Sequence, residues 1–146
     1  MRSAVIVRGV VGFALVMATL FTGFPVGAGT LQPHIVVVPS VGLHNHEFVK
    51  VRGAGFKPRD SVFIVECLAT AKGQAQCDIS TVVSATITAK GVLPLTRFKV
   101  VTGKVGSGRC GTTLKNLRAC AVSVGNMRGQ DSTSARIAFV KPAARS

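Results

Sequence analysis

The sequence predicts an all-β domain of the sandwich or barrel class, and three observations support this prediction. Short segments whose apolar residues recur with a period of two follow one another along the chain. Gly- and Pro-rich turns separate these segments at close spacing. No window beyond the N-terminal segment shows helical periodicity. We therefore expect about seven short strands in one domain.

The N-terminal 28 residues are predicted to be a secretory signal peptide. Arg2 and Arg8 provide positive charge, residues 9–24 are apolar and uncharged, and Val26-Gly27-Ala28 precedes a cleavage site. A retained anchor helix is the alternative, but the apolar run is shorter than the roughly 20 residues that span a bilayer. We thus expect export to the extracellular space or cell envelope, with no stable membrane insertion. The predicted division is 1–28 signal peptide, 29–141 β domain and 142–146 basic tail.

The first half of the predicted domain is centred on the stretch from Glu47 to Cys77. An earlier strand, 34–38, ends at Pro39-Ser40. Residues 48–52 alternate, with Val49 and Val51 on the face that we expect to be buried. A turn-rich corner over 53–60 then leads to a nearly continuous apolar run over 61–67. This pattern predicts a hairpin whose second strand is covered on both sides.

The second half contains four more predicted strands. Strand 81–89 buries every second residue and is followed by a tight turn at Lys90-Gly91. The next strand, 92–101, changes its apolar phase between Leu95 and Phe98, which predicts a bulge. The last two strands are predicted over 119–124 and 135–140, the latter with Ala135, Ile137 and Phe139 facing in; a long loop is expected over 101–117 and a polar hairpin tip over 125–133.

All four cysteines lie in the part expected to be exported, which favours two disulfides. Three pairings are possible; we choose nearest neighbours, Cys67–Cys77 and Cys110–Cys120, each with C-x9-C spacing. Each closed loop is expected to contribute roughly 2.5–3 kcal/mol in the chain-entropy model. A zinc site is the alternative, but C-x2-C spacing is missing. We expect no metal.

The charge balance points to an anionic partner, because 18 Lys and Arg residues oppose 5 Asp and Glu residues, a net charge of +13. The chain has no Trp and no Tyr, which disfavours the aromatic stacking used by sheet-based nucleic-acid readers. Non-specific, salt-dependent polyanion binding is the remaining possibility. The candidate polyanion-binding residues are Lys50, Arg52, Lys104, Arg109, Lys115 and Arg118.

Motifs for catalysis are missing, and we expect no catalytic residues and no enzyme activity. The sequence contains neither G-x-S-x-G nor H-E-x-x-H. A hydrolase would need a nucleophile and base that no motif supplies. Glu66 is unusual because it sits in an apolar strand directly before Cys67; we expect it at a strand end beside a Lys or Arg, and it would be functional if it faced a cleft.

Several segments, taken in order, resemble the neocarzinostatin family, the apoproteins of enediyne chromoprotein antibiotics. They are V-V-P-S-V-G-L (37–43), V-K-V-R-G-A-G-F (49–56), E-C (66–67) with its C-x9-C interval to Cys77, C-A-V-S-V (120–124) and A-R-I-A-F (135–139). The resemblance implies a seven-stranded immunoglobulin-like β-sandwich with two intradomain disulfides. It also implies a carrier, because in this family a cleft beside the sandwich shields a DNA-cleaving enediyne.

The resemblance also indicates, by position, which residues would face a ligand. Ala69 and Val82 stand where the family's chromophore proteins carry aromatic side chains. Two functions follow: a secreted monomeric carrier of an enediyne-like or other hydrophobic molecule, with DNA association as in the family, or a basic envelope protein that adheres to anionic polymer without a chromophore. The positions implied for ligand binding are Leu68, Ala69, Gln76, Val82, Ala121, Ser123 and Gly125.

Overall fold

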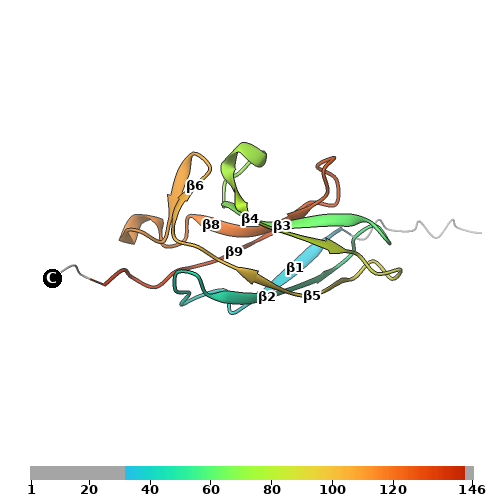
Figure 1. The fold of residues 1–146 in the computed structure, drawn as a ribbon, viewed down its shortest axis with the longest axis horizontal. Coiled ribbons are helices and arrows are strands. Elements are labelled where there is room, and N and C mark those ends of the chain that lie inside the picture. Colours follow the sequence, from blue (N-terminus) through green and yellow to red (C-terminus); the bar gives the residue numbers. More distant parts are fainter. Residues whose placement is uncertain (1–31, 144–146) are drawn as a thin grey trace, which may run out of the picture.

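The computed structural model describes residues 32–143, and these form a two-layered β-sandwich (Figure 1). One layer is a three-stranded sheet in the order β1-β2-β5, and the other is a four-stranded sheet in the order β4-β3-β8-β9. A separate two-stranded hairpin, β6-β7, stands beside the four-stranded layer. The strands are β1 (His34–Val38), β2 (Phe48–Ala54), β3 (Ser61–Leu68), β4 (Cys77–Thr86), β5 (Leu93–Lys99), β6 (Gly103–Val105), β7 (Gly108–Cys110), β8 (Cys120–Gly125) and β9 (Thr133–Arg136), with two 3-10 turns, η1 (Gln74–Gln76) and η2 (Leu114–Asn116).

The predicted sandwich of seven strands and both predicted disulfides, Cys67–Cys77 and Cys110–Cys120, are confirmed. The predicted signal peptide and residues 144–146 of the basic tail lie outside the described residues. Within residues 32–143, no helix has the length and apolar character needed to cross a membrane.

The core lies between the two layers and is built by the alternation of each strand. Val49 and Val51 of β2 are fully buried, as the period of two predicted, while their neighbours on the strand face solvent. Val122 and Val124 of β8 oppose them from the other layer's inner face. Such apolar burial is the main stabilising contribution to a domain of this size.

The predicted hairpin between β2 and β3 is wrong, because these strands belong to different layers. β2 pairs with β1 and β5, whereas β3 pairs with β4 and β8. The turn-rich corner between them carries the chain from one sheet to the other, with Gly55 and Arg59 at positive φ. A period of two reports which face of a strand is buried and does not identify its partner, so sequence alone left this choice open.

The predicted irregularity in β5 is present but lies slightly earlier than expected. Val51 pairs with Thr96 and Gly53 pairs with Leu93, so β5 holds one more residue than β2 across this interval. The extra residue falls at Pro94 and Leu95, both exposed. Proline suits this position because β5 is an edge strand and Pro has no N–H for a ladder.

The long loop predicted over 101–117 is wrong in part, since it contains the β6-β7 hairpin and η2. Gly106, with φ of 52°, makes the hairpin turn, and Val105 anchors the hairpin in the core at 0% exposure. Glycines there permit a tight turn as readily as flexibility. Two strand boundaries differ from the prediction. β4 begins at Cys77 instead of residue 81, and β9 covers Thr133–Arg136 instead of 135–140. Ile137 and Phe139 still face the core as predicted.

Candidate functional site

An open cleft of about 630 Å³ lies on the outer face of the four-stranded sheet. Its floor is the outward face of β3, formed by Phe63, Val65 and Cys67, because successive residues of a strand point to opposite faces. The segment around η1 forms one wall, and the β8-β9 loop forms the other. The wall and floor residues beyond β3 are Ala71, Lys72, Gly73, Gln74, Cys77, Ile79, Val82, Ser123, Val124, Gly125, Asn126, Met127, Gly129, Ser132, Thr133 and Ser134.

The prediction that β3 is covered on both sides is therefore wrong. Val62, Ile64 and Glu66 are fully buried against the other layer, whereas Phe63 and Val65 are only partly covered. The continuous apolar run of β3 arises because one face contributes to the core and the other to the cleft.

A wide irregularity in β4 shapes the rim of the cleft. Ile64 pairs with Val83 but Glu66 pairs with Asp78, so four residues of β4 lie opposite Val65 alone. This bulge places two large apolar side chains at the rim, with Ile79 77% and Val82 40% exposed; Met127 on the opposite wall is 72% exposed. Apolar side chains gathered around an open cleft indicate a site for an apolar partner.

The wall at η1 is held from two sides. The Cys67–Cys77 disulfide ties it to the floor strand β3. On its other side the β6-β7 turn presses against it: a Cβ added to Gly106 would lie 2.5 Å from the Cα of Gln76. The hairpin therefore supports the wall by packing against it, and the Cys110–Cys120 disulfide fixes the base of the hairpin to β8.

Three of the seven residues expected to face a ligand line the cleft: Val82, Ser123 and Gly125. Four are placed elsewhere, and they occupy structural positions. The Leu68 side chain lies under Gly108 of the hairpin, where an added Cβ would approach it to 2.8 Å. The Ala69 N–H donates to Ala119, the Gln76 side chain accepts from the Lys72 N–H, and Ala121 is 1% exposed.

Several lining residues were not predicted from the sequence, chiefly Phe63, Val65, Ile79 and Met127. The first two could have been found by counting back in steps of two from Cys67 along β3. No sequence pattern indicates the two wall segments, because a loop's path depends on the hairpin and disulfide that hold it.

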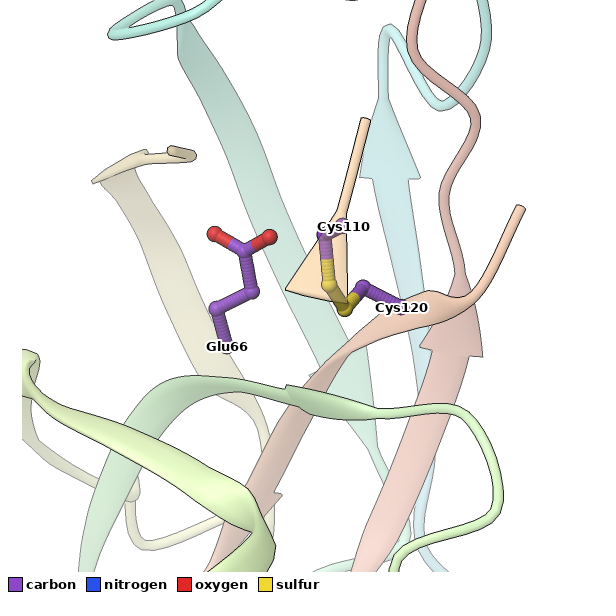
Figure 2. Close-up of side chains that lie close together, drawn as sticks. All are labelled: Glu66, Cys110 and Cys120. Atoms are coloured by element: carbon purple, nitrogen blue, oxygen red, sulfur yellow. A yellow bond between two sulfur atoms is a disulfide. The ribbon is translucent and has the colours of Figure 1, made fainter. Parts of the chain in front are cut away.

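Glu66 lies inside the sandwich and does not face the cleft. Its Oε2 accepts a hydrogen bond from the Val101 N–H at 2.8 Å, and its Oε1 has no hydrogen-bond partner among the described residues. Figure 2 shows its carboxyl group beside the Cys110–Cys120 disulfide. The predicted strand-end position beside a Lys or Arg is therefore wrong: no such ion pair forms in the part of the chain that the structure describes.

Burial raises the pKa of Glu66 to about 7, since desolvation penalises the charged form. The Val101 N–H opposes this rise in pKa, and the charge of Asp78 adds to it. Glu66, Cys110 and Cys120 come within 4.8 Å of one another. They do not form a zinc site of the kind considered above, because the two sulfur atoms are joined in a disulfide and supply no thiolate.

The predicted polyanion-binding residues separate into two groups. Lys50 and Arg52 lie on the outer face of the three-stranded sheet. The other four, Lys104, Arg109, Lys115 and Arg118, lie on the β6-β7 hairpin and around η2, beside the four-stranded layer (Figure 1). All six are exposed.

Comparison with known proteins identifies similar folds. The sequence model described as the Neocarzinostatin family matches residues 35–139. A solved structure of macromomycin is 25% identical with a TM-score of 0.57, covering 75% of this chain and 100% of that chain. The solution conformation of apokedarcidin is 24% identical with a TM-score of 0.52, covering 75% and 99%. No curated protein matches the sequence.

Proposed function

The chain belongs to the neocarzinostatin family, and from this premise we propose that it is a secreted, non-enzymatic protein that carries an apolar small molecule in the cleft on its four-stranded sheet. The observation that carries the proposal is the cleft itself. Its volume of about 630 Å³ falls within the roughly 300–1,000 Å³ typical of small-molecule sites.

The two sides of the cleft favour a ligand with an apolar body and a few hydrogen-bonding groups along one edge. The floor and the β4 rim offer Phe63, Val65, Ile79 and Val82, which gain from burial against an apolar surface. The side formed by β8, β9 and their loop offers hydroxyl groups from Ser123, Ser132, Thr133 and Ser134. Phe63 is the one aromatic residue among the described residues that line the cleft, so shape and aliphatic contact contribute more than stacking.

The chemistry of the lining supports carriage without catalysis. The described residues that line the cleft include no His, Asp or Glu. Their serine hydroxyls consequently have no His, Asp or Glu in the described lining to activate them as a general base. Glu66 is a buried carboxyl that lies between the floor residues Val65 and Cys67 in the sequence. Its side chain points into the core, on the other side of β3 from the cleft. A bound molecule would be shielded and left chemically unchanged.

Val82→Asp is expected to weaken binding of the neutral apolar dye Nile red by at least about tenfold, because a charge on the rim must be desolvated when the dye binds. Val92→Asp is the matched control: both valines are 40% exposed, but Val92 does not line the cleft. Dye fluorescence titration measures both affinities. Equal affinities for the two variants would contradict the cleft as the binding site.

The natural ligand can be sought in the protein purified from its native secretion medium. Because the chain has no Trp and no Tyr, absorbance above 300 nm in that material comes from a bound molecule. The proposal expects such absorbance, lost after Val82→Asp and retained after Val92→Asp. The carrier function would be contradicted if the protein from the native source were colourless and if Val82→Asp left the affinity for Nile red unchanged.

We propose non-specific association with DNA or another polyanion as a second function, through the cations of the hairpin and η2. Lys104 and Arg109 lie directly opposite each other across β6-β7, where like charges repel unless an anion neutralises them. No acidic residue occurs in the sequence between Asp78 and Asp131, a span that includes this group. This function also fits an envelope protein that adheres to anionic polymer.

The double variant Lys104→Gln/Arg109→Gln is expected to reduce the slope of log affinity for duplex DNA against log salt by about 1.8, since each neutralised phosphate contributes roughly 0.9. Arg128→Gln/Arg136→Gln removes the same charge from the β8-β9 loop and β9 and serves as control. Titrations at several salt concentrations give the slopes. The same reduction in both variants would show that only net charge matters and would contradict a defined hairpin site.

A further inference from the structure

The outer face of the three-stranded sheet combines positive charge with exposed apolar side chains. It lies on the layer opposite the four-stranded sheet (Figure 1), and the outer face of that sheet carries the cleft. We call it the β1-β2-β5 face. Its cations are Lys50, Arg52, Arg97 and Lys99, and its apolar side chains are Val36, Val38, Phe48 and Leu95, which are 43%, 52%, 51% and 63% exposed.

The charges of this face have no counterion within the sheet. None of the three strands contains an Asp or Glu, and Lys50 lies directly opposite Arg97. Like charges in directly opposite positions are unfavourable in an antiparallel pair. The Arg97 guanidinium lies 4.4 Å from the centroid of the Phe48 ring, which orients this charge along the face. An anionic partner would relieve the repulsion between the cations.

The apolar side chains decide which kind of anionic partner fits. Val36 is paired with Arg52, and Val38 with Lys50, so each valine lies beside a cation. A shallow depression of about 240 Å³ is lined by Val38, Lys50, Arg52 and Leu95. A nucleic acid or a polysaccharide anion would neutralise the cations but leave these aliphatic side chains in water. A bilayer accommodates both, because phosphates meet the cations while apolar side chains enter the boundary between headgroups and acyl chains.

We propose that the β1-β2-β5 face docks on the surface of an anionic lipid bilayer. The face offers four cations for lipid headgroups and four apolar side chains for the interface beneath them. Docking in this orientation leaves η1 and the β8-β9 loop, the two walls of the cleft, on the side away from the membrane (Figure 1). The docked protein could therefore still load or release a ligand through the cleft, although the docking does not depend on one.

Vesicle co-sedimentation tests the proposal with vesicles of phosphatidylglycerol mixed with phosphatidylcholine, compared with phosphatidylcholine alone. The protein is expected to bind the anionic vesicles and not the neutral ones. Lys50→Gln/Arg52→Gln should weaken that binding about 25-fold, since each cation near an anionic membrane contributes roughly fivefold. Arg128→Gln/Arg136→Gln removes the same charge away from this face and should weaken it less than threefold.

A second pair of variants separates a bilayer from a soluble polyanion. Val36→Thr/Val38→Thr keeps the β-branched shape at two exposed strand positions, and a thermal melt confirms that the variant folds. It should weaken vesicle binding about fivefold or more and leave the affinity for heparin unchanged. Unaltered vesicle binding by this variant, or equal losses from the two arginine- or lysine-to-glutamine pairs, would overturn the proposal.

Discussion

Glu66→Gln is expected to raise the free energy of unfolding by about 2–3 kcal/mol at pH 8 and to change it by less than about 1 kcal/mol at pH 4. Glu66 is fully buried, with one carboxyl oxygen unpartnered among the described residues, and burial raises its pKa from 4.5 to about 7. Glutamine resembles the protonated acid, keeps an oxygen for the Val101 N–H and cannot ionise.

The sign of the pH dependence follows from the two pKa values. Below pH 4.5 the carboxyl is protonated in both the folded and the unfolded chain, so ionisation costs the folded state nothing. Between pH 4.5 and about 7 the unfolded chain loses its proton first, which destabilises the folded state progressively. Above about pH 7 both states are ionised and the loss of stability reaches its plateau.

Urea unfolding at pH 4, 5.5 and 8 measures this difference. Glu47→Gln makes the same chemical change at a partly exposed carboxylate that accepts the His44 N–H, and it should give no stabilisation at pH 8. If Glu66→Gln and the unaltered protein gave parallel profiles between pH 4.5 and 7, the buried carboxyl could not be the source of the pH dependence.

Glu66 also shows how far alternation along a strand predicts a structure. Val62 and Ile64 precede it in steps of two, and that pattern alone places Glu66 on the buried face. Its hydrogen-bond partner, Val101, is 35 residues further along the chain. The partner depends on how β5 leaves the other layer, and no local pattern contains that information. The expectation of a nearby Lys or Arg was wrong because it considered charge without the strand's phase.

The fold and the cleft also divide into features that local sequence patterns predict and features that distant contacts decide. The inward faces of β2, β4 and β8, the pairing of the cysteines and the sandwich class could all be predicted from period, spacing and resemblance. Sheet membership could not, because the corner between β2 and β3 suits either a hairpin or a crossing between layers. The cleft was only partly predictable: its floor follows the phase of β3, but its walls are loops placed by distant contacts.

Gly106→Ala is expected to lower the free energy of unfolding by about 3 kcal/mol. The residue has φ of 52°, a conformation that costs a non-glycine residue roughly 1–2 kcal/mol. Its new Cβ would also lie 2.5 Å from the Cα and carbonyl carbon of Gln76, which are backbone atoms that cannot rotate away. Either the β6-β7 turn or η1 must move, and overpacking of this kind adds roughly 1–3 kcal/mol.

Gly42→Ala is the control that separates the cost of the positive φ from the cost of the contact with Gln76. Gly42 has a φ of 70°, but nothing lies within 4 Å of the Cβ that the substitution would add. Its expected loss is therefore only about 1–2 kcal/mol. Thermal or urea unfolding compares the two variants. Equal losses would mean that the hairpin does not press on η1 in solution.

The functional consequence of Gly106→Ala follows from the position of η1. Gln74 and Cys77, at the start of this turn and just after it, line the cleft, so a displacement of η1 changes the shape of the wall that faces a ligand. The Cys67–Cys77 disulfide limits that displacement at one end of the wall. The rest of the wall is held in place by the hairpin. Gly106→Ala should accordingly weaken Nile red binding, whereas Gly42→Ala should not. A destabilised Gly106→Ala protein that binds the dye normally would assign the hairpin to stability alone.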